Sequence, residues 1–323
     1  MIVVTGGAGF IGSNLVRALN DLGEFAILIV DNLNSHLKES NLADLQFADF
    51  IDKREFRRSL APGLNVGKCD AIYHQGACTS TVEQDWEYLR DNNVEYSREL
   101  LAFALARGIP FVYASSGAVY GDSKVFSEEA QNERPLNLYG RSKSLFDDYV
   151  RGILGSARTT VVGLRYFNVY GPREAHKGRM SSVIHQWGAE LRERDRLRLF
   201  RGSGGYGDGE QRRDFIFVRD VIDANLFFGR GEVRRGIYNV GTGGTHSFNE
   251  VARAVIRQSG HGHIEYVDMP EDVRSTYQSF TQADISRLRA AGYDSPMTEL
   301  ERGVSLTLGQ QRSAQSGAQP QRA

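Results

Sequence analysis

Hydrophobic and polar residues alternate along the first half of the chain in two ways. Short apolar runs rich in β-branched residues are typical of buried strands, and between them apolar residues recur every three or four positions, as in amphipathic helices. The predicted strands span residues 2–4, 26–30, 71–74, 111–114 and 160–164, and the predicted helices include 11–21, 94–107 and 139–154. This alternation indicates βαβ units, and we therefore predict an α/β fold with a doubly wound parallel sheet.

The pattern becomes less regular after about residue 170. A Gly-rich stretch covers residues 202–209, a strand is predicted at 214–218, and residues 236–244 have the pattern of a strand followed by a turn. These features indicate a smaller second lobe that is interleaved with returns to the sheet.

The expected domain boundaries follow from this reading. Residues 1–169 form the sheet domain, with returns near 213–240, and residues 170–212 and 241–308 form a smaller α/β lobe. Residues 309–323 are mostly Gln, Ser, Ala and Gly, so we expect a disordered tail there.

Composition narrows the classes of partner. The formal net charge is -1, so no global positive field would hold a nucleic acid or an anionic membrane. Cys69 and Cys78 are too few for a disulfide framework, and no metal-binding Cys/His spacing surrounds them. The start lacks a basic segment, and no apolar run is long enough to span a bilayer. We expect a cytoplasmic protein with a small-molecule partner and no metal.

The first predicted strand runs directly into a glycine-rich loop. Gly6, Gly9 and Gly12 are spaced so that the backbone can approach a pyrophosphate at the start of the next helix. Asp31 follows at the end of the second strand, where an acidic residue accepts hydrogen bonds from an adenosine ribose. This context predicts a Rossmann-type dinucleotide site, although an ordinary tight turn has the same glycines.

The few lysines refine the choice of dinucleotide. The chain has 39 basic residues, of which 6 are Lys and the remaining 33 are Arg. Asn32, Lys38 and Lys53 follow the second strand, and the two lysines could neutralise a ribose 2′-phosphate. We therefore expect NADP, with NAD as the alternative if both lysines are solvated surface residues.

Tyr139 and Lys143 are one turn apart on the same face of a predicted helix. An ammonium about 4 Å away would lower the pKa of a phenol from about 10 to about 7. Tyr139 could then exchange a proton with a substrate alcohol while a nicotinamide takes or returns hydride. Ser115 and Ser116 follow the strand 111–114, and we expect one of them, Ser116, to orient that alcohol; a turn or helix cap is the alternative role.

These segments together resemble the extended short-chain dehydrogenase/reductases that act on nucleotide sugars. The resemblance extends over nearly all residues before the tail. Residues 117–118 are Gly and Ala, whereas related 4,6-dehydratases carry an acidic pair there, so the resemblance does not favour dehydration. The segments that carry it are 5–12, Asp31, 114–121, Tyr139 with Lys143, 165–173, 213–215 and 238–243.

A second set of segments is similar to the heptose 6-epimerase family and differs from UDP-galactose 4-epimerases. This set consists of residues 74–79, 91–93, Asn168, 173–178 and 277–284. The resemblance implies inversion of C6 in an ADP-linked heptose, from the D-glycero to the L-glycero epimer, for lipopolysaccharide core synthesis. The route is transient oxidation to a C6 carbonyl, rotation of that carbonyl, and return of the hydride to its other face.

Within this family Tyr139 and Lys177 would be the two acid-base residues, one for each orientation of the carbonyl. Lys suits this role because a desolvated amine can lose its proton, while a guanidinium does not. The alternative is that Lys177 is a surface lysine or binds a substrate phosphate.

The resemblance also implies the binding residues, some of which could instead be packing residues of the second lobe. Arg213 would pair with the substrate diphosphate. The implied cofactor contacts are Gly6, Gly9, Phe10, Ile11, Gly12, Asp31, Asn32, Lys38, Lys53, Gln75, Gly76, Ala77, Cys78, Thr79, Asn92, Lys143, Val169 and Lys177. The implied substrate contacts are Ser116, Asn168, Arg179, Gln186, Phe200, Arg201, Gly202, Ser203, Arg213 and Tyr277.

Three features depart from the family pattern. Arg179 replaces a small residue, Gln186 replaces a His and follows His185, and the loop 202–209 is longer. The resemblance also implies a homo-oligomer, with a pentamer as the candidate form. Two other functions stay open at this point: a UDP-hexose 4-epimerase, and a non-catalytic sensor that binds NADP through the same fold.

Overall fold

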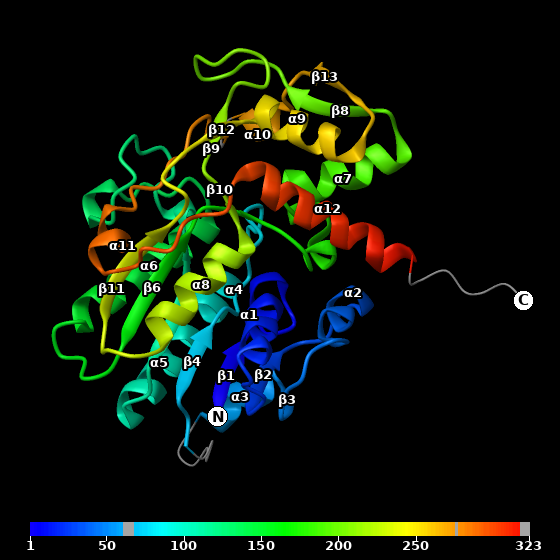
Figure 1. Cartoon of the computed structure of the whole chain (residues 1–323). Helices are drawn as coiled ribbons and strands as arrows, with labels where there is room; N and C mark the ends of the chain where they lie inside the picture. The colour runs from blue at the N-terminus through cyan, green and yellow to red at the C-terminus, as the bar shows by residue number, and fades with distance from the viewer. Residues whose placement is uncertain (61–67, 275–276, 317–323) are drawn as a thin grey trace, which may run out of the picture.

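A seven-stranded, all-parallel sheet forms the centre of the molecule (Figure 1). The computed structural model describes residues 1–60, 68–274 and 277–316. The strand order is β11-β6-β5-β4-β1-β2-β3, so the chain winds outward from β1 in both directions and confirms the Rossmann-type doubly wound sheet. The strands are β1 (Ile2–Thr5), β2 (Ile27–Asp31), β3 (Asp49–Asp52), β4 (Ala71–His74), β5 (Phe111–Ser116), β6 (Val161–Tyr166) and β11 (Arg235–Val240).

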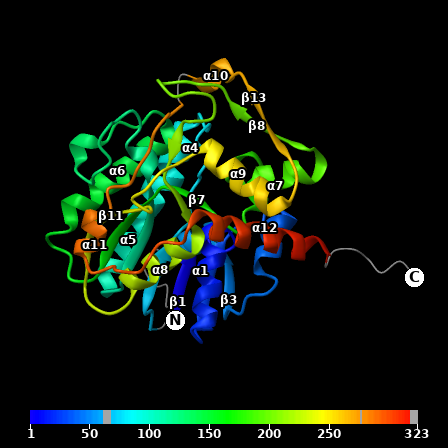
Figure 2. The same cartoon turned by 45° about the horizontal axis from the view of Figure 1, so that its top comes forward.

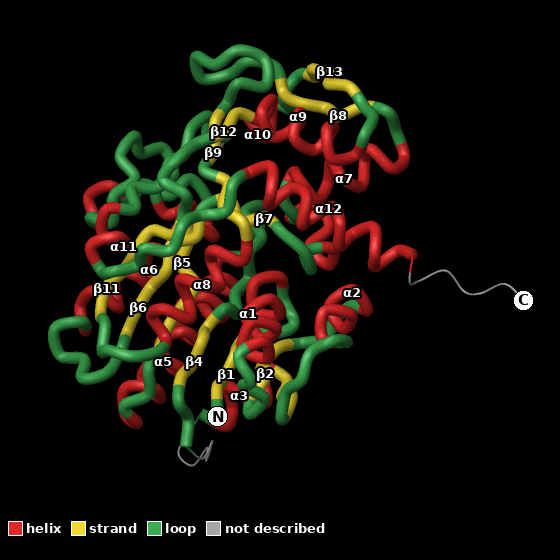
Figure 3. The backbone as a smooth tube through the Cα atoms, in the orientation of Figure 1, coloured by secondary structure: helices red, strands yellow, loops and turns green. Residues whose placement is uncertain are grey.

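Helices cover both faces of this sheet (Figure 3). Successive strand residues point to opposite faces, so Val4 packs in the cluster that holds α1 (Phe10–Asp21) and α8 (Val218–Gly229). Val3 packs in the other cluster, with α3 (Lys53–Ser59), α5 (Tyr96–Arg107) and α6 (Leu138–Ile153). Burial on both faces explains why the strands are continuous apolar runs.

A second group of elements lies beyond the carboxyl ends of the strands (Figure 2). Its helices α7 (Val183–Glu193), α9 (Phe248–Ser259) and α12 (Leu300–Ser316) pack against one another. Its strands form three pairs: β7 (Asn168–Tyr170) with β10 (Phe215–Phe217), β8 (Arg196–Phe200) with β13 (His263–Val267), and β9 (Arg212–Arg213) with β12 (His246–Ser247). Helix α9 begins with a capping box in which Ser247 and Glu250 satisfy each other's backbone amides.

Short elements complete the chain. They are α2 (His36–Glu39), η1 (Ser40–Leu42), α4 (Trp86–Leu89), the π-helical η2 (Arg90–Glu95), η3 (Gly117–Val119), η4 (Ala130–Asn132), η5 (Ala175–Met180), α10 (Glu271–Arg274) and α11 (Ser286–Ala290). No helix among the described residues is long and apolar enough to cross a membrane.

The tail predicted from residue 309 differs from the structure. Helix α12 continues to Ser316, so the prediction of disorder is wrong for residues 309–316, and residues 317–323 lie outside the described part. The first turns of α12 are anchored by buried Leu300, Val304 and Leu308. Extending a nucleated helix requires no further core residue, because each added residue gains a backbone hydrogen bond.

Candidate active site

The glycine loop between β1 and α1 lines a cavity of about 410 Å³, called here the first cavity. Gly9 precedes α1 without a side-chain cap, and residues 9–12 border the cavity, so the start of the helix faces it. Such a helix start favours an anion through its free amides and its dipole. The cavity is therefore suited to a dinucleotide pyrophosphate.

Two of the loop glycines are required by close packing. Gly6 has φ +68°, and a Cβ on it would lie 2.7 Å from Gly76. A Cβ on Gly12 would lie 2.1 Å from the carbonyl oxygen of Gly6. No side chain fits at either position, which is the sterically closed turn that the dinucleotide interpretation requires.

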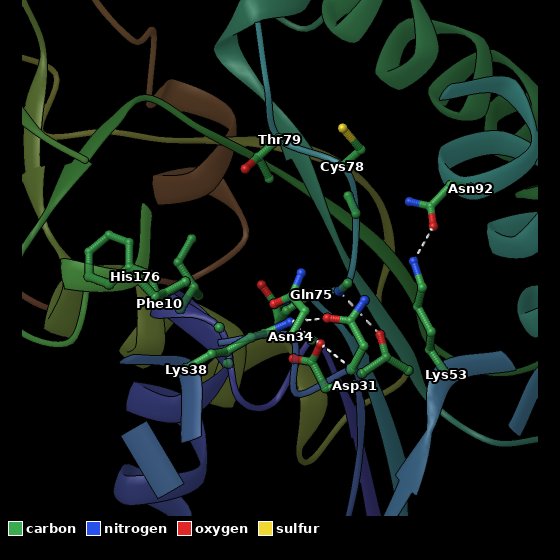
Figure 4. A pocket seen from close by; sticks show the side chains of 18 of the residues that line it. Phe10, Asp31, Asn34, Lys38, Lys53, Gln75, Cys78, Thr79, Asn92 and His176 are labelled. Atoms are coloured by element: carbon green, nitrogen blue, oxygen red, sulfur yellow. Dashed lines mark hydrogen bonds and ion pairs between the residues drawn. The ribbon is translucent and has the colours of Figure 1, made fainter. Parts of the chain in front are cut away.

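The far end of the first cavity carries charged groups from β2, α2 and α3. Asp31 is 6% exposed and accepts hydrogen bonds from the Ala8 amide at 2.9 Å and from the Lys38 ammonium. Lys38 also donates to Asn32 at 2.8 Å, and Lys53 donates to Asn92 at 2.9 Å (Figure 4). The pKa of Lys53 is lowered by burial and by the charge of Lys38. Both lysines line the cavity with a single carboxylate between them, and neither is a solvated surface residue.

The loop after β4 forms the opposite wall of the first cavity, with Gln75, Gly76, Ala77, Cys78 and Thr79 among its lining residues. Asn93, in the π-helical segment, holds this loop: its side chain accepts from the Cys78 amide at 2.8 Å and donates to the Cys78 carbonyl at 3.0 Å. The same amide reaches Ser142 on α6 at 3.0 Å. Asn93 thus fixes the loop after β4 relative to the helix that carries Tyr139 and Lys143.

A buried histidine supports the same wall. The Ser97 hydroxyl donates to the Asn93 carbonyl at 2.7 Å, so its oxygen accepts from His74 Nε2 at 2.8 Å. His74 Nδ1 then accepts from the Thr5 hydroxyl at 2.6 Å, and Thr5 Oγ1 accepts from the Gly76 amide at 3.2 Å. Burial lowers the pKa of His74 to about 3, so the ring is neutral. Its role is to hold β1, β4 and α5 together.

A second cavity of about 420 Å³ adjoins the first. Phe10, Gln75, Thr79, Lys177 and Met180 are among the residues that line both. The second cavity also brings together predicted catalytic and binding groups from distant parts of the chain. These include Ser116, Tyr139, Lys143 and Arg213.

The prediction that Lys143 makes the Tyr139 phenol acidic is wrong for the structure as it stands. Burial raises the pKa of Tyr139, while a hydrogen bond with Ser116 lowers it in part. The Lys143 ammonium lies 6.0 Å from the centre of the Tyr139 ring and donates to the Ala114 carbonyl at 2.9 Å. Burial lowers the pKa of Lys143 to about 8. Desolvation disfavours both the Tyr139 phenolate and the Lys143 ammonium, and the spacing of the two residues in the sequence does not reveal that cost.

The two serines after β5 have different surroundings. Ser115 is 2% exposed and donates to the Asp147 carboxylate at 2.9 Å, so its hydroxyl is used inside the protein. Ser116 accepts from the Ala118 amide at 3.1 Å and lies beside Tyr139 in the second cavity. Ser116 is therefore the hydroxyl that can reach a ligand.

Asp147, which the sequence did not single out, anchors a buried network under this site. Its carboxylate is fully buried and also accepts from the Tyr113 hydroxyl at 2.8 Å and from Arg165 at 2.9 Å. Arg165 is fully buried as well and pairs with Glu133. A buried ion pair of this kind is costly to break, so it fixes β5 and α6 relative to β6.

Lys177 lies in η5, in the segment that follows β7. It lines both cavities, and its ammonium lies 5.2 Å from the centre of the Phe10 ring. Burial lowers the pKa of Lys177, and the nearby Glu174 carboxylate opposes that change. A desolvated amine at the junction of the two cavities is placed to exchange a proton there.

Arg213 is 7% exposed and forms no ion pair with any carboxylate of the described residues. Its guanidinium lies 5.1 Å from the centre of the Tyr277 ring, and Tyr277 packs edge-on against Phe200 at 6.0 Å. Burial lowers the pKa of Arg213. A buried guanidinium without a carboxylate partner favours an anionic ligand.

Several predicted substrate residues do not border either cavity within the described part of the chain. Gln186 donates to the carbonyls of Arg179 and Ser181, so it is occupied locally. Arg201 is exposed and pairs with acidic residues on the surface. The residues outside both linings are Arg179, Gln186, Phe200, Arg201, Gly202, Ser203 and Tyr277, while Asn168 and Val169 border the second cavity.

The structure also adds lining residues that the sequence reading did not assign. His176 borders the first cavity next to Lys177, and Tyr166 borders the second. Tyr166 donates to Gln75 at 2.9 Å, and Asn225 donates to Tyr166 at 2.8 Å. Tyr166 and His176 lie in segments that carry the family resemblance, and that resemblance could have identified them from the sequence. No feature of the sequence pointed to Asn225.

Comparisons with known proteins agree with this geometry. Residues 2–241 match the model of the NAD dependent epimerase/dehydratase family. A protein from Alkalilimnicola ehrlichii named ADP-L-glycero-D-manno-heptose-6-epimerase is 52% identical over 304 residues, which cover 94% of this chain and 95% of that protein.

Solved structures are similar over almost the whole chain. The ADP-L-glycero-D-manno-heptose-6-epimerase of Helicobacter pylori has a TM-score of 0.83 at 30% identity, with 97% of this chain and 96% of that chain covered. The UDP-glucose 4-epimerase of Thermus thermophilus, solved in complex with NAD, has a TM-score of 0.80 at 29% identity, with 97% and 99% covered.

Proposed function

Because this chain belongs to the NAD dependent epimerase/dehydratase family, we propose that it is an epimerase that inverts C6 of an ADP-linked heptose. The single observation that carries the proposal is the second cavity, where Tyr139, Ser116 and Lys177 meet beside the dinucleotide crevice. The similarity to two proteins named ADP-L-glycero-D-manno-heptose-6-epimerase supports the substrate. The sequence resemblance places the product in lipopolysaccharide core synthesis.

The cofactor is proposed to be NADP. The family and a neighbour solved with NAD support a nicotinamide dinucleotide, and the first cavity has the glycine turn and helix start to receive its pyrophosphate. Lys38 and Lys53 border the same cavity with Asp31 as the only carboxylate in its described lining, which favours an additional phosphate on the ribose. A nicotinamide bound there supplies a hydride acceptor that later returns the hydride, so it is not consumed.

The protein residues would handle the protons and the orientation of the substrate. Lys177, as the neutral amine, takes the proton of the C6 hydroxyl as the carbon is oxidised. The C6 carbonyl then rotates about its bond to the sugar ring and presents its oxygen to Ser116 and Tyr139. The Tyr139 phenol gives the proton that completes the inverted alcohol, and in the reverse reaction the two groups exchange these roles. Arg213 holds the diphosphate so that the sugar stays in the cavity.

The pKa directions agree with these roles. Burial lowers the pKa of Lys177, which favours the neutral amine that takes a proton, and it raises the pKa of Tyr139, which favours the protonated phenol that gives one. Ser116 opposes the second effect. These two directions suit a cycle in which the amine takes one proton and the phenol gives one.

An assay with two substrates tests the proposal. The purified protein is incubated separately with ADP-D-glycero-D-manno-heptose and with UDP-galactose, and the epimers are separated by anion-exchange chromatography. Inversion of the ADP-heptose with no change in UDP-galactose is expected. Interconversion of the UDP-hexose alone would identify a 4-epimerase, and no turnover of any nucleotide sugar would favour a non-catalytic binder.

A further inference from the structure

The segment that carries Lys177 is held at both ends by one buried carboxylate. Glu174 is fully buried, and it accepts a hydrogen bond from the Gly171 amide at 3.3 Å. It also accepts from the amide of Ser182 at 2.6 Å and from its hydroxyl at 2.7 Å. Gly171 precedes η5 and Ser182 follows it, so the two carboxylate oxygens close the segment into a loop.

The same segment contains unusual backbone conformations. Arg173 has φ +71°, the only positive φ of a non-glycine residue in the described chain, and Gly178 has φ +52°. A left-handed conformation at Arg173 costs energy unless neighbouring contacts hold it. Arg173 donates to the Asn41 carbonyl at 2.5 Å and to Asp44 at 2.7 Å. Arg173 therefore ties the segment to Asn41 in η1 and to Asp44, two residues beyond η1, and Glu174 fixes the internal shape of the segment.

Lys177 depends on this arrangement for its place. Its backbone amide donates to the Glu174 carbonyl at 3.0 Å, and its ammonium forms no ion pair with the described residues. The charged or titratable groups that interact with it are Glu174, which favours its ammonium, and His176 and His185, whose pKa values it lowers. A side chain without a direct ionic partner is aimed by its backbone and its packing alone.

We propose that Glu174 is a positioning residue for Lys177, because its carboxylate closes the η5 segment and aims the amine into the junction of the two cavities. The inference rests on the proposed function, in which Lys177 transfers one of the two protons. Glu174 itself is buried below the segment and borders neither cavity. It would therefore affect proton transfer without contacting the substrate.

Kinetics of three variants of the full chain give the first test. Glu174→Ala removes the carboxylate that accepts hydrogen bonds from Gly171 and Ser182. Glu174→Gln retains the size of the side chain but removes its charge and one acceptor oxygen. We expect Glu174→Ala to lower kcat by roughly 10- to 100-fold, because small displacements of a catalytic group have effects of that order. KM for the nucleotide sugar should stay within about threefold, since ground-state binding is unaffected. Glu174→Gln should lower kcat less.

A matched control separates positioning from general stability. Asp220 is also a buried carboxylate that accepts from a backbone amide and a hydroxyl of one residue, Thr298, at 2.9 and 2.7 Å. It borders neither cavity in the described part of the chain. Asp220→Asn should lower the melting temperature as the Glu174 variants do, yet leave kcat within about twofold of the wild type.

Chemical labelling of Lys177 gives a second readout that does not depend on turnover. The purified protein is pulsed with acetic anhydride at a series of pH values, and acetylation of the peptide that contains Lys177 is measured by mass spectrometry. The Glu174 carboxylate favours the ammonium, so its loss in Glu174→Gln should move the half-point of acetylation to lower pH. Asp220→Asn should not move it.

The outcomes separate this proposal from the proposed function. Unchanged kcat in both Glu174 variants, a kcat loss equal to that of Asp220→Asn, or an unmoved acetylation half-point in Glu174→Gln would each overturn the positioning role. If the wild-type protein turns over no nucleotide sugar, the proposed function fails. In that case the acetylation profile alone decides whether Glu174 controls Lys177.

Discussion

The steric closure of the glycine loop gives a quantitative prediction. In Gly12→Ala the added Cβ would lie 2.1 Å from the Gly6 carbonyl oxygen, whereas ordinary contact begins near 3.4 Å. The loop or the start of α1 must therefore move by about 1.3 Å, the difference between 3.4 and 2.1. Because the clash is between backbone groups, no side-chain rotation relieves it. Overpacking of this kind costs about 1–3 kcal/mol.

If that cost appears in cofactor binding, the dissociation constant for NADP should rise about 5- to 140-fold. Isothermal titration calorimetry on protein freed of nucleotide measures it directly. Gly152→Ala is the matched control, because a Cβ there meets nothing within 4 Å and alanine is well tolerated in a helix. This variant should bind NADP with the affinity of the wild type. Wild-type affinity in Gly12→Ala would refute the view that the loop is a closed cradle for the pyrophosphate.

Three further predictions concern substitutions of particular side chains. Tyr139→Phe should lower kcat by about 10²–10⁴-fold, while calorimetry should show an unchanged affinity for NADP. The control Tyr149→Phe, on the same helix, should retain activity. Comparable rates in the two variants would contradict the acid-base role of Tyr139. Replacing Lys38 and Lys53 together by Met should reduce the preference for NADP over NAD by about tenfold or more, and an unchanged ratio of dissociation constants would show that the phosphate lies elsewhere. The pKa of His74 in the folded protein is lowered to about 3. Below pH 6.5 this histidine is therefore protonated in the unfolded chain but stays neutral in the folded protein, so the free energy of unfolding falls as the pH drops. Between pH 6 and 4, the free energy of unfolding from urea titrations should fall with pH about 1.4 kcal/mol per pH unit more steeply for the wild type than for His74→Asn. Parallel curves would mean that His74 is protonated in the folded protein.

The sheet was predictable because its strands are buried on both faces. The five predicted strands begin within one residue of β1, β2, β4, β5 and β6. Strand β3 was missed, since its sequence Asp-Phe-Ile-Asp belongs to a partly exposed edge and lacks a continuous apolar run.

The site was predictable where local sequence fixes the backbone. The glycine loop and the Tyr139/Lys143 spacing place their residues through one turn or one helix face. The Asp147–Arg165 pair joins residues 18 positions apart, and it depends on where helix α6, which carries Asp147, lies relative to strand β6, which no local pattern contains. The predicted lowering of the Tyr139 pKa failed for a related reason, because burial depends on the whole fold.

The predicted substrate contacts outside the sheet agree least well with the structure. Arg179 follows Gly178, whose φ of +52° turns the chain inside η5, and Gln186 is used to hold the two carbonyls before its own helix. Sequence position therefore did not give side-chain direction. Arg213 lines the second cavity, where strand β9 places it beside Phe248, and its role toward a substrate stays a prediction.

The central claim is that hydride leaves C6 and returns to its opposite face in one closed site, while Tyr139 and Lys177 transfer the protons. The most direct measurement uses ADP-heptose carrying deuterium on C6, incubated with the protein in ordinary water and followed by proton NMR and mass spectrometry. We predict an inverted product that retains its deuterium with the wild type, and almost no inversion with Lys177→Met. Loss of the deuterium to solvent during inversion, or full activity of Lys177→Met, would contradict the account.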